Sequence, residues 1–172
     1  MPKKSSKEVI YWDTCIFLAW LKDETWRPNH EMDGVYDALH AVETGKATML
    51  TAATTFGEIR KTRHPQVWDM FEGFMKRRNV RVVDVDPRIH ALAAQLRDHY
   101  QSENRRDGLG ELRVMDSEHL AAAIRYKADA FYTFDNGRKG GRGLLQLDGN
   151  VAGHKLAVCK PPVGQTSLFT SA

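Results

Sequence analysis

Cysteine is scarce in this chain of 172 residues, where only Cys15 and Cys159 are present. Two cysteines do not make a disulfide framework, so a reduced, cytoplasmic protein is expected. Long apolar runs are also lacking, because charged residues recur every few positions. The sequence therefore predicts neither a signal peptide nor a membrane-spanning helix. It contains no internal repeat, and it lacks the paired-cysteine and His-x-x-x-His spacings that zinc sites use.

The charge balance is only mildly basic. Lysine and arginine number 25 against 22 aspartates and glutamates, which gives a net charge of +3. Such a balance permits a nucleic-acid partner without requiring one. Hydrophobic residues make up 42% of the chain, as in globular proteins. The length suits one domain. We expect this domain at residues 9–160, between a flexible segment at 1–8 and a C-terminal tail at 161–172.

Short apolar, β-prone runs alternate with stretches of helical periodicity along the chain. Strands are predicted at residues 9–12, 47–50, 80–85, 130–134, 144–147 and 155–159. The main helices are predicted at residues 14–21, 67–76, 87–100 and 116–128, with further helices before Gly45 and from about residue 54. Residues 102–110 read as a charged loop. This alternation predicts an α/β fold, a three-layer α/β/α sandwich around a mostly parallel sheet.

Four acidic residues occupy the ends of these predicted elements. Asp13 and Asp135 directly follow strands, and ligands of open α/β sheets bind outside the carboxyl ends of strands. Glu58 and Asp116 lie at the starts of helices, where a carboxylate often serves only as a cap. Thr55 and Glu58, for example, have the spacing of a capping box. Each helix-start acid taken alone therefore has a purely structural explanation.

The four acids taken together favour a metal site. Carboxylates that converge on one edge of a sheet repel one another, and a bound cation relieves that repulsion. Ligand sets made only of oxygen select hard ions such as Mg²⁺ or Mn²⁺ over zinc. The sequence therefore predicts a divalent-metal site built from carboxylates that are distant along the chain.

The same residues resemble the motifs of the PIN domain family in order, interval and type of element. The four similar segments are residues 13–18, 54–59, 116–123 and 133–135. The resemblance extends over residues 9–160. Two positions differ from many members of the family: Cys15 stands in place of Asn or Ser, and Phe134 stands in place of Asn.

The resemblance implies a Mg²⁺- or Mn²⁺-dependent nuclease in which all four acids are catalytic residues and metal ligands. The first three would hold the main ion, and Asp135 would complete the site or hold a second ion. The hydroxyls of Thr14 and Thr133 are candidates for orienting carboxylates or a water molecule. His119 is expected to be a partly buried histidine with satisfied hydrogen bonds rather than a general base.

The resemblance further implies a VapC-like toxin that cleaves RNA, forms a homodimer and is inhibited by an antitoxin protein. Basic residues close to the acids in the sequence are candidates for phosphate contacts, although any such run can also be a solvated surface. These candidates are Arg60, Lys61, Arg138, Lys139 and Arg142. Trp26 and Trp68 are candidates for stacking on bases, although such tryptophans more often lie in a core or an interface.

The tail favours a different substrate. Gln165, Leu168 and Phe169 resemble the short peptide by which bacterial proteins bind the DNA sliding clamp, and such a peptide would act as a docking segment. That alternative is a DNA-directed or structure-specific nuclease linked to replication. A second alternative is a PIN module that binds RNA without cutting it. Substrate comparison with and without a divalent ion separates the three hypotheses.

Overall fold

The computed structural model describes residues 7–28, 30–137 and 140–164. Five parallel strands form one sheet in the order β3-β2-β1-β4-β5. The strands are β1 (Glu8–Trp12), β2 (Ala47–Ala52), β3 (Val80–Val83), β4 (Ala130–Tyr132) and β5 (Ala157–Cys159). The helices are α1 (Thr14–Leu21), α2 (Glu31–Glu43), α3 (Thr54–Arg60), α4 (Pro65–Met75), α5 (Pro87–Asp107), α6 (Val114–Arg125) and the 3₁₀ helix η1 (Leu144–Leu147).

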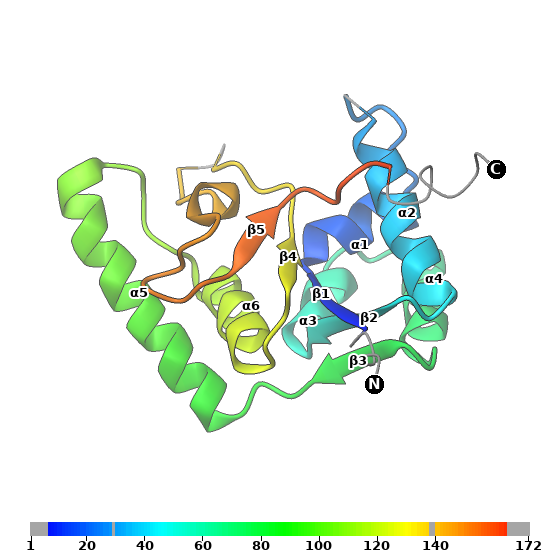
Figure 1. Cartoon of the computed structure of the whole chain (residues 1–172), viewed down its shortest axis with the longest axis horizontal. Helices are drawn as coiled ribbons and strands as arrows, with labels where there is room; N and C mark the ends of the chain where they lie inside the picture. The colour runs from blue at the N-terminus through cyan, green and yellow to red at the C-terminus, as the bar shows by residue number, and fades with distance from the viewer. Residues whose placement is uncertain (1–6, 29, 138–139, 165–172) are drawn as a thin grey trace, which may run out of the picture.

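Helices cover both faces of the sheet, as the alternation of elements predicted. Helices α1 to α4 pack on one face, and α5, α6 and η1 pack on the other (Figure 1). Successive side chains of β1 serve the two faces in turn, since Ile10 and Trp12 enter the first core whereas Tyr11 enters the second. The three-layer α/β/α sandwich is confirmed.

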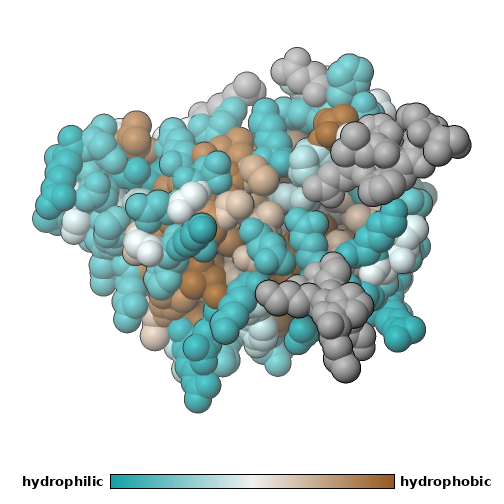
Figure 2. Space-filling view, in the orientation of Figure 1, coloured by the Kyte–Doolittle hydropathy of each residue, from teal (hydrophilic) through white to brown (hydrophobic). Residues whose placement is uncertain are grey.

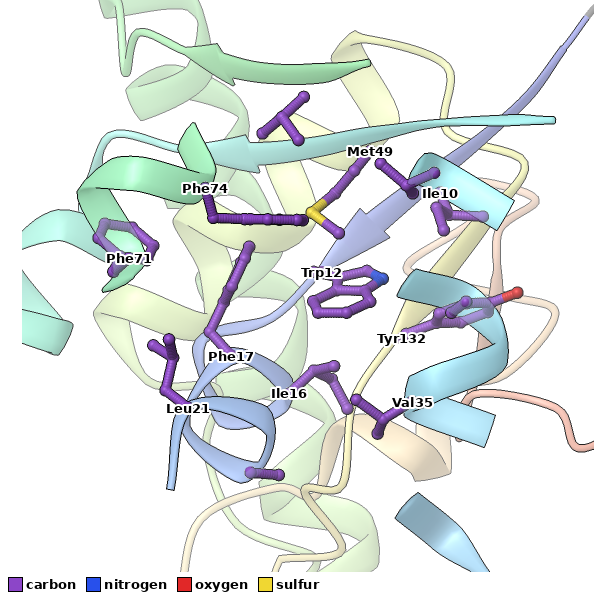
Figure 3. Close-up of a cluster of buried hydrophobic side chains, with 14 of the residues drawn as sticks. Ile10, Trp12, Ile16, Phe17, Leu21, Val35, Met49, Phe71, Phe74 and Tyr132 are labelled. Carbon is purple, nitrogen blue, oxygen red and sulfur yellow. The ribbon is translucent and has the colours of Figure 1, made fainter. Parts of the chain in front are cut away.

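Aromatic side chains fill the core beneath α1 and α4. Trp12 at the end of β1 lies against Phe17, with 5.2 Å between ring centroids, and Phe17 meets Phe71 edge-on at 5.5 Å. Phe74 completes this group (Figure 3). Each of these rings is at most 2% exposed. Their packing holds α1, and the turn that leads into it from β1, against the sheet.

The outer surface is mostly hydrophilic, as Figure 2 shows for one face. No helix in the described ranges is long and apolar enough to cross a membrane. The chain after β5 runs along α2, where Lys160 pairs with Glu31 at 2.6 Å and the amide of Gly164 donates to Asp37. A Cβ on Gly34 would lie 2.1 Å from the carbonyl oxygen of Pro161, so glycine permits this close approach. The start of the predicted tail, up to residue 164, is therefore part of the packed domain.

Besides small shifts at the ends of several elements, three differences from the prediction change the element to which a segment belongs. Residues 144–147 form η1 instead of a strand, because both Leu144 and Leu147 turn into the core at a spacing of three residues. Helix α5 continues through the predicted loop to Asp107 and ends where Gly108 adopts a φ of 67°. Strand β1 begins at Glu8, paired with Ala47, so residue 8 belongs to the sheet rather than to a flexible segment.

Candidate functional site

The strand order changes direction between β1 and β4. We call the carboxyl edge of these two strands, together with the side chains around it, the crevice. The chain leaves β1 into α1 on one face of the sheet and leaves β4 towards η1 on the other. Such a reversal opens a ligand site outside the carboxyl ends of the two strands. Asp13 and Asp135 stand at this edge, and the amide of Asp13 donates to the carbonyl of Tyr132 across the strands at 3.1 Å. The sheet therefore brings together two of the predicted acids.

Asp13 is held by donors on both of its carboxylate oxygens. Its Oδ1 caps α1 by accepting from the amide of Thr14 at 2.7 Å. Its Oδ2 accepts from the hydroxyl of Thr133 at 2.7 Å and from the thiol of Cys15 at 3.1 Å. Burial and the Asp13 charge raise the pKa of Cys15 well above its ordinary value, so the thiol keeps the proton that it donates. Thr133 in turn accepts from the amide of Asp135 at 3.0 Å.

Glu58 projects from α3 towards α1 and α6. The hydroxyl of Thr14 donates to its Oε2, and Nε2 of His119 lies 2.7 Å from the same oxygen. Burial raises the pKa of Glu58, but the donors His119 and Thr14 outweigh it, so that the pKa lies below its ordinary value. The predicted capping box does not form, because Thr55 bonds to Thr51 at 2.7 Å instead. The carboxylate of Glu58 therefore bonds to residues of α1 and α6 and does not cap its own helix.

His119 lies on α6 and is fully buried. Its Nδ1 is 2.7 Å from the hydroxyl of Tyr11, which also accepts from the amide of Ala52 at 2.9 Å. Burial lowers the pKa of His119, but the hydrogen bond to Glu58 and the charges of nearby carboxylates outweigh that effect and raise the pKa. The sequence predicted satisfied hydrogen bonds for this histidine but underestimated its burial.

Asp116 lies in the first turn of α6, where it is partly buried. Burial raises its pKa to about 7, and the charges of Asp13 and Asp135 contribute to the rise. His119 and Arg113 lower the pKa, but they compensate only in part. Asp116 is therefore close enough to both strand-end carboxylates to be repelled by them. This crowding joins the third predicted acid to the crevice.

Carboxylate oxygens dominate this crevice, and that donor set fits a hard divalent cation such as Mg²⁺ or Mn²⁺ better than zinc. Burial raises the pKa of Asp116, the charges of Asp13 and Asp135 add to that rise, and a cation at this point would oppose both effects. In the part of the chain that the structure describes, however, no three acidic, histidine or cysteine side chains already stand in a metal-binding arrangement. The chemistry of the site fits a metal, although the ligands are not preassembled around one position.

Comparison with known proteins agrees with this geometry. Residues 10–139 match the PIN domain as a sequence family, which is more than half of the chain. The chain belongs to the PIN domain family. The family is one of nucleases, which hydrolyse phosphodiester bonds. No curated protein sequence matches the chain.

Solved structures with a similar fold include three bacterial complexes. VapBC2 from Rickettsia felis, bound to a DNA fragment from its promoter, is 13% identical with a TM-score of 0.56, covering 87% of this chain and 98% of that one. DNA-bound VapBC from Salmonella typhimurium is 13% identical with a TM-score of 0.54, covering 88% and 98%. A toxin–antitoxin complex from Klebsiella pneumoniae is 15% identical with a TM-score of 0.52, covering 77% and 94%. At these identities the likeness concerns the fold.

One predicted phosphate contact of this PIN domain is contradicted. Arg142 is 5% exposed, and its guanidinium binds both carboxylate oxygens of Asp107 at 2.9 Å. It also donates to the carbonyl of Gly110 at 3.2 Å and lies over the ring of Tyr100. A buried, paired arginine stabilises the end of α5 and is not available to a substrate phosphate. The sequence did not reveal this because the pairing joins residues 35 positions apart.

The other predicted contacts have different positions. Arg60 lies over the ring of Trp68 at 4.6 Å, beside a cavity of about 330 Å³ near the start of α4. Lys61 is exposed at the end of α3. The predictions for both residues as phosphate contacts stay predictions. The remaining candidates lie outside the described residues: Arg138, Lys139, Gln165, Leu168 and Phe169.

An exposed tryptophan stands near the crevice. Trp26 is 74% exposed, and its ring is 5.2 Å from the guanidinium of Arg27. The same guanidinium lies 4.2 Å from the ring of Phe134, the residue before Asp135. Arg27 is also paired with Glu24 at 2.7 Å, so its charge is compensated within the loop. Trp26 is therefore an exposed aromatic surface that Arg27 connects to Phe134, the residue before Asp135.

Proposed function

We propose that this PIN domain is an endoribonuclease that requires Mg²⁺ or Mn²⁺. The observation that carries the proposal is the placement of the partly buried Asp116 close to Asp13 and Asp135, whose charges add to the effect of burial in raising the pKa of Asp116 to about 7. A protein that had no use for this arrangement would gain stability by removing one of the three charges. A divalent cation is the partner that makes three carboxylates favourable together.

Some residues of the crevice would bind the ion, and others would orient these ligands. Asp13, Asp116 and Asp135 would bind it, and Glu58 would contribute directly or through a water molecule. Thr133 and Thr14 would hold Asp13 and Glu58 in place through the hydrogen bonds described above. A bound divalent ion supplies an activated water molecule and stabilises the leaving oxygen of the phosphodiester.

We further propose that the protein is the toxin of a toxin–antitoxin pair and forms a homodimer. The similar structures from Rickettsia felis, Salmonella typhimurium and Klebsiella pneumoniae contain such pairs, which supports an antitoxin partner. The apolar residues Phe17, Leu21 and Val35 of α1 and α2 are buried in the core of the single chain. A dimer would therefore use other surfaces, such as the exposed part of Tyr36.

The test compares single-stranded RNA, single-stranded DNA and flapped duplexes in Mg²⁺, in Mn²⁺ and in a chelator. The wild type is expected to cut RNA only with a divalent ion, and Asp116→Asn to abolish cleavage while retaining the fold. Asp98→Asn, which changes an exposed aspartate on α5, is the matched control and should cut normally. Cleavage restricted to DNA would favour the replication-linked alternative. RNA binding without cleavage under any ion would favour a non-catalytic module.

A further inference from the structure

A buried chain of hydrogen bonds connects the sheet to Glu58. The amide of Ala52, at the end of β2, donates to the hydroxyl of Tyr11 at 2.9 Å. That hydroxyl is 2.7 Å from Nδ1 of His119, and Nε2 of His119 is 2.7 Å from Oε2 of Glu58. Tyr11 and His119 have no exposed surface, and the Tyr11 ring stacks on Phe131 at 5.0 Å. The steps between Ala52, Tyr11 and His119 therefore take place away from water, and the last step reaches the partly exposed Glu58.

The hydrogen-bond partners place a donor on Nε2 of His119. One lone pair of the Tyr11 oxygen accepts from Ala52, and the phenolic hydrogen is available for Nδ1 of the neutral imidazole, which then carries its proton on Nε2. In the charged imidazole Nδ1 donates to the Tyr11 oxygen instead, and Nε2 still presents a proton to Glu58. The rigid backbone of β2 thus sets the orientation of the His119 ring. The ring in turn presents a donor to Glu58 at a fixed position.

The chain ends on the same oxygen of Glu58 that Thr14 uses. Both the hydroxyl of Thr14 and Nε2 of His119 contact Oε2. Two donors from different helices, α1 and α6, leave the carboxylate little freedom to rotate. Glu58 is only partly buried, with 24% of its side chain exposed, so without these donors it would be free to turn towards solvent. The bonds therefore determine where its second oxygen lies.

The same elements carry the other acids of the crevice. Tyr11 precedes Asp13 by two positions on the strand, and His119 follows Asp116 by three positions on α6. We propose that Tyr11 and His119 are positioning residues that hold the Glu58 carboxylate in register with Asp13 and Asp116 for a divalent ion. This inference rests on the proposed metal-dependent function. It goes beyond it by assigning a role to two buried residues that are not themselves ligands.

A metal-binding measurement tests the proposal without relying on catalysis. The affinity of the purified protein for Mn²⁺ is measured by electron paramagnetic resonance for the wild type, Tyr11→Phe, His119→Ala and His119→Gln. Replacing a residue that hydrogen-bonds to a metal ligand typically lowers the metal affinity by about 10–100-fold. His119→Ala should therefore weaken Mn²⁺ binding by a factor in this range. Tyr11→Phe removes the hydrogen bonds of the hydroxyl with His119 and Ala52 but keeps the ring, and should weaken Mn²⁺ binding roughly two- to tenfold. His119→Gln keeps an N–H donor near Glu58 and should recover part of the affinity.

Tyr100→Phe is the matched control. The hydroxyl of Tyr100, a residue of α5, also accepts a backbone hydrogen bond, from the amide of Ala152 at 2.9 Å, and among the described residues it bonds to none of the four acids. A merely structural role predicts that both variants lower the melting temperature and that both keep the wild-type Mn²⁺ affinity. The proposal predicts weaker Mn²⁺ binding in Tyr11→Phe alone.

Two negative results are distinguishable. If the wild type binds Mn²⁺ and Tyr11→Phe binds it equally well, the positioning role is overturned and the proposed function is untouched. If the wild type shows no Mn²⁺ binding, the metal-dependent function itself is contradicted, and the inference is lost with it. Because Tyr11→Phe retains the packing of the ring, it decides the question even if His119→Ala fails to fold.

Discussion

The replacement Asp116→Asn should stabilise the metal-free protein at neutral and higher pH. The ordinary pKa of this carboxyl is 3.8, and its environment raises the value to about 7. Each pH unit between the two values corresponds to about 1.4 kcal/mol, so the charged form costs the fold at most about 4 kcal/mol. Asparagine has nearly the same shape and carries no charge. It therefore removes the cost of burying the charge and also the repulsion by Asp13 and Asp135.

The sign of the effect depends on pH. Below pH 3.8 the carboxyl is protonated in both folded and unfolded chains, so the variant and the wild type should be equally stable. As the pH rises to about 7, the unfolded chain loses this proton before the folded chain does, and the wild type loses stability. Above pH 7 the full difference should be present. Part of it will be offset, because removing Asp116 also removes one of the charges that raise the pKa of His119.

Urea unfolding in a chelator at pH 5 and pH 8 measures this difference. We expect Asp116→Asn to exceed the wild type by about 2–4 kcal/mol at pH 8 and by less at pH 5. Saturating Mn²⁺ should reverse the order, because an ion that binds only the folded state stabilises the wild type more than a variant that lacks a ligand. Asp98→Asn should behave as the wild type throughout. An Asp116→Asn variant that is less stable than the wild type at pH 8 without metal would refute the electrostatic reasoning.

Further expectations follow from packing and from exposed groups. Gly34→Ala should lower the free energy of unfolding by about 1–3 kcal/mol, because the added Cβ meets the carbonyl of Pro161. Gly73→Ala has open space around the added Cβ and should raise the free energy of unfolding by about 0.5–1 kcal/mol. Urea titration measures both. Trp26→Ala should weaken binding of single-stranded RNA by roughly fivefold or more in a fluorescence anisotropy assay, with Trp26→Phe close to the wild type; equal binding by all three would exclude stacking. Arg142→Gln should lower the melting temperature and leave RNA affinity unchanged, and a selective loss of RNA affinity would restore its role as a phosphate contact.

The sheet and the acids at its edge were predictable because their signals are local. A short apolar run that ends in an aspartate marks Asp13 and Asp135 within a few residues, and parallel strands bring their carboxyl ends to one edge. The extent of α5 was not predictable from its polar surface. Its last turns are set by the buried Tyr100 and by Gly108, which permits the left-handed ending. The charged residues between them form the exposed side of a helix rather than a loop.

The connections within the site were the least predictable part. The spacing of Thr55 and Glu58 is a local signal for a capping box, but the cap does not form. Glu58 instead accepts hydrogen bonds from Thr14 on α1 and His119 on α6. The Tyr11–His119 pair joins residues 108 positions apart, and no local pattern encodes it. One signal was available: Tyr11 lies on the opposite side of β1 from Trp12, which places a polar hydroxyl in a core that α6 covers.

A crystal structure of the protein soaked in Mn²⁺, with anomalous diffraction recorded for manganese, tests the central claim most directly. We predict an anomalous peak at the carboxyl edge of β1 and β4, within bonding distance of carboxylate oxygens from at least two of Asp13, Asp116 and Asp135. A well-ordered crevice without such a peak at saturating Mn²⁺, or a peak bound only by other side chains, would contradict the claim that these acids form a metal-dependent nuclease site.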